Sequence, residues 1–400
     1  MSQPQVVLAF SGGLDTSFCV PYLKDQGYEV ITLFVDTGGV TQEERQAIAD
    51  RSKELGAKEH ITEDAGEAIW DEVVKPLLWG GQRYQGQYPL LCSDRYIIVR
   101  KALELCTARG INIFAHGCTG MGNDQVRFDQ TVRSLGDFEI KAPIREIQKE
   151  HKQVRAYEES YLRERGFAVD AKTTKYSINA NLLGVTTSGS EVDRFETPGP
   201  ETYTISKPRA QWPQGPLQVK ITFKEGVPTA VNGQALNGEA MIQKLNKMFG
   251  DYGVGRFIYT GDTTVGLKGR IVFECPGIQA LLVAHQALEE SILTQAQNSF
   301  KPIIAQQWVE LVFKGHFYEP LKYDLEHALK SSQTHVNGDV TLHTDGGSVE
   351  AVAIESEHIL QKAGAVYAQS ADWTMEEVQG FIKLLGQSTT LSTQINPKGK

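Results

Sequence analysis

The chain has 400 residues, of which 40% are apolar and 22% charged, and its formal net charge is −9. This composition is typical of a globular protein with room for two domains, and the negative charge disfavours a nucleic-acid-binding surface, which needs clustered lysine and arginine. No apolar run approaches the length of a membrane span and the N-terminus lacks the basic region of a signal peptide, so we expect a soluble cytoplasmic protein.

The five cysteines are scattered along the chain, and none of them forms a CxxC pair. Their odd number does not allow complete pairing, and their spacing does not match a zinc site. Free, buried thiols are typical of proteins in a reducing cytoplasm. We therefore expect neither a disulfide framework nor a protein-bound metal.

The first 165 residues alternate short apolar strands with amphipathic helices. We expect buried strands at Val6–Phe10, Val30–Val35, His60–Thr62 and Ile111–Ala115. We expect helices from the first glycine turn to Tyr22, from the capping box of Thr41 and Glu44 to Gly56, around Ile69–Leu77, and at Asp94–Arg109. The alternation predicts an α/β fold, in which a Rossmann-like parallel sheet forms a nucleotide-binding domain over residues 1–165.

The pattern changes in the second half of the chain. A polar helix over about Arg145–Arg165 is expected to bridge to a second, α+β domain at residues 166–370, and Thr186–Pro216 is expected to be an extended connection. The expected strands and hairpin turn are Gln218–Phe223, Val340–His343, Val349–Ile354 and Asn232-Gly233. The expected helices are Met241–Phe249, Gln279–Phe300, Pro302–Phe313 and Leu321–Lys330. Residues 371–400 carry a last helix, from the capping box at Thr374 to Leu385, which we expect to make an intersubunit contact.

Two glycines follow the first strand, in the segment Ser11-Gly12-Gly13-Leu14-Asp15-Thr16-Ser17. They let the backbone turn tightly, and the helix that follows presents unpaired N–H groups that suit a phosphate. The segment lacks the GxxxxGK[ST] lysine of kinases and GTPases, and it lacks the GxGxxG spacing of a dinucleotide site. It therefore predicts a nucleotide-phosphate loop of another kind.

A second glycine loop, HGCTGMGNDQVRF over His116–Phe128, follows the strand Ile111–Ala115. It is expected at the same carboxyl edge of the sheet, where open α/β sheets bind ligands. Asn123, Asp124 and Arg127 lie within about one helical turn of one another. Asn and Asp also serve as N-caps, but capping does not account for the glycines before them. The two loops therefore predict a ligand site at the carboxyl edge of the sheet.

The first loop matches SGGxD[ST]S, and it thereby resembles the ATP pyrophosphatase (PP-loop) superfamily. AHGCTGMGNDQVRFD resembles THGxTGKGNDQVRFE, the hallmark of the argininosuccinate synthase family, and the similar organisation extends over about residues 1–370. The resemblance implies a carbon–nitrogen ligase of arginine biosynthesis that uses ATP and Mg²⁺ and forms a homotetramer. The ureido oxygen of citrulline would attack the α-phosphorus and release pyrophosphate, and aspartate would then displace AMP from the citrullyl-adenylate.

The resemblance also implies which residues of this sequence contact each substrate. The contacts implied for ATP are Ala9, Phe10, Ser11, Gly12, Gly13, Leu14, Asp15, Thr16, Ser17, Val35 and Gly117. Those implied for aspartate are Thr119, Asn123 and Asp124. Those implied for citrulline are Tyr88, Ser93, Asn123, Arg127, Ser177 and Thr186. Positioning and electrostatics would carry catalysis, with Asp15, Asp124 and Arg127 as positioning candidates and no general base assigned. We expect no nucleic-acid or membrane partner.

Several motif positions depart from the family pattern and indicate a divergent subgroup. The lysine of the second glycine loop is Met121, so one positive charge near anionic ligands is missing. In the segment that resembles YEGxYxLGTSxARP, the threonine is Cys92 and ARP is replaced by Arg95-Tyr96-Ile97. In the segment that resembles YSxDxNL, the aspartate is Asn179.

Another departure concerns the amino-acid end of citrulline. The acidic residue and the tyrosine that help to hold it in the family fall on Gly261 and Phe273. Each lost charge-assisted hydrogen bond would cost about 1.5–3 kcal/mol of recognition. Two alternatives follow: Asp262 substitutes for the lost carboxylate, or the substrate is an N-acylated citrulline.

Other functions of nucleotide-binding proteins are less consistent with the sequence. Thiolation enzymes need paired cysteines and a basic RNA-binding face, and glutamine-dependent relatives need a glutaminase cysteine; neither is visible. A non-catalytic adenine-nucleotide-binding protein is a further alternative, although such modules are usually one small α/β domain. Release of pyrophosphate that depends on aspartate would separate a ligase from a sensor.

Overall fold

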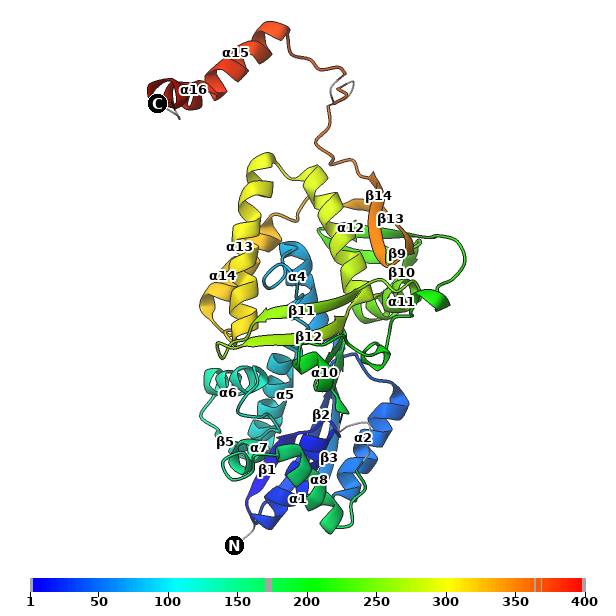
Figure 1. Cartoon of the computed structure of the whole chain (residues 1–400), viewed down its shortest axis with the longest axis vertical. Helices are drawn as coiled ribbons and strands as arrows, with labels where there is room; N and C mark the ends of the chain where they lie inside the picture. Colours follow the sequence, from blue (N-terminus) through cyan, green and yellow to red (C-terminus); the bar gives the residue numbers. More distant parts are fainter. Residues whose placement is uncertain (1–2, 170–174, 363–364, 368, 398–400) are drawn as a thin grey trace. The chain divides into compact units, whose positions relative to one another are not determined.

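The computed structural model describes residues 3–169, 175–362, 365–367 and 369–397 (Figure 1). The chain divides into two compact units, Met1–His358 and Ile359–Lys400. Among the described residues, no helix combines the length and the apolar character that crossing a membrane requires.

A five-stranded parallel sheet forms the first part of the first unit (Figure 1). Its strands are β1 (Gln5–Ala9), β2 (Glu29–Asp36), β3 (Glu59–Asp64), β4 (Ile113–Ala115) and β5 (Glu139–Lys141), in the order β3-β2-β1-β4-β5. Alternate residues of β1 enter different cores: Val7 packs in one apolar cluster, and Val6 and Leu8 pack in the other. Both faces of the sheet are therefore covered, and the predicted α/β fold with a parallel sheet is confirmed.

The helices of this part follow the strands along the chain. They are α1 (Leu14–Asp25), α2 (Gln42–Glu54), α3 (Gly66–Ile69), a π-helical turn (Trp70–Val74), α4 (Lys75–Gly80), a 3₁₀ turn (Leu91–Ser93), α5 (Asp94–Arg109), α6 (Asp124–Leu135), α7 (Pro143–Ile147) and α8 (Val154–Glu164). The capping box predicted at Thr41 and Glu44 is formed, and Gly110 ends α5 in the left-handed conformation.

The predicted continuous helix Arg145–Arg165 is wrong. The chain forms two helices, α7 and α8, and the residues between Ile147 and Val154 are polar and offer no apolar side chain for packing. Gln148, just beyond α7, instead accepts a hydrogen bond from the N–H of Gly120 at 2.6 Å. α8 packs on α1 through the rings of Tyr161 and Phe18, whose centroids are 4.8 Å apart.

Two antiparallel sheets form the rest of the first unit. One has the order β10-β9-β8-β13-β14, from β8 (Leu217–Lys224), β9 (Val227–Val231), β10 (Gln234–Ala235), β13 (Gly338–Gly346) and β14 (Ser348–Glu355). The other has the order β11-β12-β7-β6, from β6 (Ser177–Asn181), β7 (Gly184–Ser188), β11 (Arg256–Asp262) and β12 (Lys268–Glu274). The predicted hairpin turn is confirmed, since Asn232 and Gly233 both have positive φ angles, of 51° and 76°. The extended connection predicted at Thr186–Pro216 is wrong at its start, because Thr186 lies inside β7.

The helices of this part are α10 (Ser190–Asp193), α11 (Gly238–Gly250), α12 (Pro276–Ile292), α13 (Gln295–Lys314) and α14 (Pro320–Ser331), with 3₁₀ turns at Pro200–Thr202 and Arg209–Gln211. The predicted helix break at Pro302 is wrong, because Pro302 lies inside α13. The break lies at Leu293-Thr294, where Thr294 and Gln297 form a capping box that starts α13.

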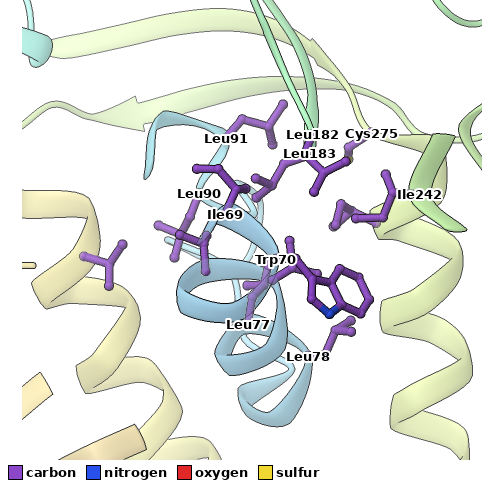
Figure 2. Packing of buried hydrophobic residues seen from close by; sticks show 14 of the residues in the cluster. Ile69, Trp70, Leu77, Leu78, Leu90, Leu91, Leu182, Leu183, Ile242 and Cys275 are labelled. Atoms are coloured by element: carbon purple, nitrogen blue, oxygen red, sulfur yellow. The ribbon is translucent and has the colours of Figure 1, made fainter. Parts of the chain in front are cut away.

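A shared apolar core joins the parallel sheet to the antiparallel part. In Figure 2, Trp70 and Leu77 lie among Leu182 and Leu183 of the β6–β7 turn and Ile242 of α11. All of these side chains belong to one buried cluster. The helices between β3 and α5 thus pack against both parts of the first unit.

The second unit contains α15 (Met375–Leu385) and α16 (Gln387–Ile395). The capping box predicted at Thr374 and Glu377 is formed at the start of α15. Large apolar side chains of α15 are exposed, among them Phe381, Ile382, Leu384 and Leu385. Such an apolar surface is typical of a helix that packs against another chain.

The β6–β7 turn touches the end of β2 at backbone level. The N–H of Leu182 donates to the carbonyl of Thr37 at 2.8 Å, and the side chain of Asn181 donates to the carbonyl of Leu91 at 2.6 Å. A Cβ atom on Gly39 would lie 2.4 Å from the backbone nitrogen of Asn181. Only glycine therefore permits this approach of the two segments.

We expect Gly39→Ala to lower the free energy of unfolding by about 1–3 kcal/mol, because the added methyl group would force two backbones apart. Chemical denaturation measures the loss. Gly380→Ala is the matched control, since a Cβ atom there meets nothing within 4 Å. Equal stability of Gly39→Ala and the unsubstituted protein would contradict the close contact.

Candidate active site

The two glycine loops lie side by side at one edge of the parallel sheet. β1 and β4 are direct parallel neighbours, with Leu8 opposite Ala115, so the loops that follow them emerge together. A Cβ atom on Gly117 would lie 3.1 Å from the side chain of Thr16. The sheet order thus brings the two loops into contact, as their positions after parallel strands predicted.

The first loop opens the N-terminus of α1 to a ligand. Gly12 adopts a positive φ of 76°, and Gly13 occupies the N-cap position, where no side chain among the described residues caps the helix. The hydroxyl of Ser17 donates to the carbonyl of Gly12 at 3.3 Å, and the N–H of Ser11 donates to Thr16 at 3.3 Å. Hydrogen bonds within the loop therefore fix its conformation, and the N-terminus of α1 suits an anion.

The other residues predicted to contact ATP surround this loop. Ala9, Phe10 and Leu14 are buried, Ser11 is exposed, and Asp15 is partly exposed at the start of α1. Val35 lies near the end of β2, the neighbour of β1. These positions lie at the carboxyl ends of two neighbouring strands, β1 and β2.

A buried carboxyl group lies beneath the first loop. Glu158 of α8 is 0% exposed, and Asp15 is its hydrogen-bonding neighbour. Burial, followed by the nearby charge of Asp15, raises the pKa of Glu158 well above its usual range. Glu158 is therefore protonated at neutral pH. Glu158 was not predicted, although it lies on the same buried helical face as Tyr161 and Leu162, and this spacing could have suggested its burial.

The second loop is fixed by a neutral histidine. The Nδ1 atom of His116 accepts from the N–H of Cys118 at 3.1 Å, and its Nε2 atom lies 3.0 Å from Asp129. Burial lowers the pKa of His116, although the hydrogen bond with Asp129 opposes this shift. The neutral ring therefore donates from Nε2, and Arg145 holds Asp129 from the other side at 2.7 Å.

An ion cluster follows the second loop at the start of α6. Asp124 accepts from Arg127 at 2.9 Å with one carboxylate oxygen and from Arg95 at 3.0 Å with the other. Arg95 also pairs with Asp94, at 2.5 Å. Arg127 donates twice to the carbonyl of Phe313, at 3.1 and 2.9 Å. The structure therefore brings Asp124 and Arg127 together, as predicted, and it adds Arg95.

Asn123 faces the β11–β12 hairpin. It occupies the N-cap position of α6, but its side chain makes no capping bond and instead accepts from the N–H of Thr264 at 2.8 Å. The capping interpretation of Asn123 is therefore wrong. The hairpin turn lies against the second loop, where Thr119 and Asn123 are both partly exposed.

Most residues predicted for citrulline gather beside this hairpin. Thr186 pairs with Phe273 across β7 and β12, and the ring of Tyr88 packs edge-on against Phe273 at 5.3 Å. Ser177 lies on β6, the neighbour of β7, and is partly exposed. Ser93 is fully buried and donates to the carbonyl of Leu90 at 2.8 Å, which leaves its oxygen only as an acceptor.

The structure gives a packing reason for Gly261. A Cβ atom there would lie 2.2 Å from the side-chain oxygen of Gln85, which accepts from the hydroxyl of Tyr259 at 2.8 Å. Asp262, considered above as a substitute, accepts from Gln85 at 2.6 Å and pairs with Lys268. Tyr259 was not predicted. It lies two residues before Gly261, and this position could have suggested its hydroxyl as a replacement for the one lost at Phe273.

The described residues include no group of three or more His, Cys, Asp and Glu side chains that could hold a metal ion. All five cysteines are free, as expected.

Comparisons with known proteins agree with this geometry. Family models of the arginosuccinate synthase N-terminal HUP domain and C-terminal domain match residues 5–166 and 176–392. The chain is 60% identical to argininosuccinate synthase of Xanthomonas campestris over 396 residues, which cover 99% of this chain and 100% of the relative. It is 59% identical to that of Xylella fastidiosa, with 99% of both chains covered. It is 36% identical to that of Methanocaldococcus jannaschii, with 96% of this chain and 97% of the relative covered.

The neutral His116 predicts a pH dependence of stability. Its folded pKa lies below the ordinary 6.5, so the unfolded chain binds one more proton below about pH 6.5 and stability falls as pH decreases. His116→Asn keeps the acceptor for Cys118 but removes this proton. Below pH 6.5 we expect its stability to depend less on pH, by up to about 1.4 kcal/mol per pH unit.

Urea denaturation between pH 5 and 7.5 measures this difference. The exposed His327 provides the control, and His327→Asn should keep the slope of the unsubstituted protein. An unchanged slope in His116→Asn would show that His116 already binds a proton in the folded state.

Proposed function

The chain belongs to the argininosuccinate synthase family, and we propose that it joins citrulline to aspartate in arginine biosynthesis, converting ATP to AMP and pyrophosphate. It is a carbon–nitrogen ligase, which the identity to curated argininosuccinate synthases over the full chain supports. The observation that carries the substrate arrangement is the contact between the two glycine loops at neighbouring strand ends.

The proposed ligand contacts follow this arrangement. The first loop, with Ala9–Ser17, Val35 and Gly117, would hold ATP, and Thr119, Asn123 and Asp124 would hold aspartate. Citrulline would contact Tyr88, Ser93, Asn123, Arg127, Ser177 and Thr186. Asn123 belongs to both amino-acid sets, so its proximity to the hairpin at Thr264 supports a place between them.

The residues would act mainly by positioning. ATP supplies the phosphorus that activates the ureido group and turns its oxygen into part of a leaving group. The N-terminus of α1 would stabilise the pyrophosphate that departs, because its N–H groups and dipole favour negative charge. Asp124 would orient the amino group of aspartate toward the activated carbon, and Arg127 would fix Asp124.

Other features of the proposal rest on the family and on composition. Mg²⁺ would bind through the phosphates held by the first loop, since it commonly binds through substrate phosphates. The exposed apolar face of α15 supports a homotetramer, and the free cysteines support a cytoplasmic location. The proposed domains are residues 1–165, 166–370 and 371–400, and the family matches at 5–166 and 176–392 support the first boundary.

The two alternative functions are not favoured. Gly261 and Phe273 allow an N-acylated citrulline, but the relatives at 59–60% identity that cover the chain are argininosuccinate synthases. Gly261 also has a packing reason of its own, since Gln85 and Tyr259 occupy the space beside it. A non-catalytic nucleotide-binding protein would not need the second set of polar motifs.

Isotope transfer tests the proposed reaction. With citrulline labelled by ¹⁸O in the ureido group, we expect one label in the AMP formed, because that oxygen bonds to the α-phosphorus and leaves with it. Mass spectrometry measures the label, and pyrophosphate release should need citrulline and nucleotide together. N-acetylcitrulline serves as the comparison substrate and should be used less well. Unlabelled AMP, or none, would contradict the proposal.

A further inference from the structure

Arg95 is a buried charged residue, and it is not among the residues predicted to contact ATP, aspartate or citrulline. Its side chain is 9% exposed, and it leaves α5 toward the start of α6. One guanidinium nitrogen contacts Asp94 at 2.5 Å, and another contacts Asp124 at 3.0 Å. Burial of an arginine is costly unless its charge is paired, so this placement needs both carboxylates.

Asp124 is held on both sides yet remains open. Its Oδ1 atom accepts from Arg127 and its Oδ2 atom accepts from Arg95, while its side chain is 38% exposed. Each carboxylate oxygen has two lone pairs, so each keeps acceptor capacity for a ligand. Two buried guanidinium groups thus fix the direction of a carboxylate that a ligand can reach.

Arg95 occupies a motif position that has no arginine in the family pattern. Where the family has ARP, this chain has Arg95-Tyr96-Ile97, so Arg95 takes the place of an alanine. Tyr96 is fully buried, stacks on Phe317 at 4.5 Å and donates to the carbonyl of Val312. The arginine of this chain therefore stands one position earlier than in the family pattern, and its guanidinium group contacts Asp124.

We propose that Arg95 is a positioning residue for the amino-acid nucleophile: it holds Asp124 ionised and oriented, so that Asp124 accepts a hydrogen bond from the α-amino group of aspartate. This inference rests on the proposed function and adds a residue to it. Arg127 shares the task from α6, and its own position is fixed by the carbonyl of Phe313.

The charges around Asp124 determine how it titrates. Burial raises its pKa, but the charges of Arg95 and Arg127 and their hydrogen bonds bring it below the ordinary value. The other titratable groups that face it are thiols and phenols, and burial raises the pKa of each; they are Cys92, Cys118, Tyr88 and Tyr96. These groups are neutral below pH 8, so the two guanidinium groups alone keep Asp124 ionised.

Steady-state kinetics of Arg95→Gln tests the inference. We expect the KM for aspartate to rise about tenfold or more, as the loss of a charge-assisted hydrogen bond implies, and the KM for citrulline to change by less than about twofold. The pKa of Asp124 should rise without Arg95, so the acid limb of kcat/KM for aspartate should move up by about one pH unit or more. Arg95→Lys keeps the charge and should restore the limb toward its original position.

Two further variants keep the test decisive. Asp94→Asn combined with Arg95→Gln avoids a buried unpaired Asp94 and should give the same kinetic change in a folded protein. Arg100→Gln is the matched control, because Arg100 lies on the same helix and pairs with Glu72 through two bonds of 2.6 Å away from the loops. It should leave both KM values and the pH profile unchanged.

Failure of the positioning role of Arg95 can be distinguished from failure of the proposed function. If the unsubstituted protein forms no AMP from citrulline, aspartate and ATP, the function is wrong. If that protein is active but Arg95→Gln keeps its KM for aspartate, the positioning role is wrong. A higher KM with an unmoved acid limb would also overturn it, because that result would indicate direct contact of Arg95 with the substrate.

Discussion

The parallel pairing of β1 with β4 is the constraint on which the site depends. Both strands end at the same edge, and each is followed by a glycine-rich loop before the next helix starts. The loops approach so closely that a methyl group on Gly117 would press on Thr16. A phosphate at the start of α1 and an amino acid at the start of α6 would therefore be neighbours without any further folding.

Two turns of the antiparallel part of the first unit contact this edge of the parallel sheet. The β6–β7 turn bonds to the end of β2 through Leu182, and the β11–β12 turn bonds to Asn123 through Thr264. Gly39 is required at the first of these approaches, because backbone atoms occupy the space of a side chain. These hydrogen bonds and the shared apolar core thus hold the antiparallel part against this edge of the parallel sheet.

The sequence predicted the features that depend on local chemistry. Apolar runs located β1 and β2, the capping boxes at Thr41 and Thr374 began real helices, and glycine content located both loops. It failed at one local signal, because Thr294 and Gln297 form a capping box that starts α13 before Pro302. It also failed where a distant contact decides the outcome, since the partners of Asn123, Arg95 and Glu158 come from other elements.

The charged groups around the second glycine loop balance one another. Met121 is exposed and brings no charge to the second loop, while His116 and the protonated Glu158 are neutral. Asp94 and Asp124 are matched by Arg95 and Arg127, so the cluster as a whole has no net charge. The backbone dipoles at the start of α1 would favour a phosphate tail bound at the first loop. The same neutrality would let Asp124 present its open oxygens to an amino group without adding repulsion toward bound phosphates.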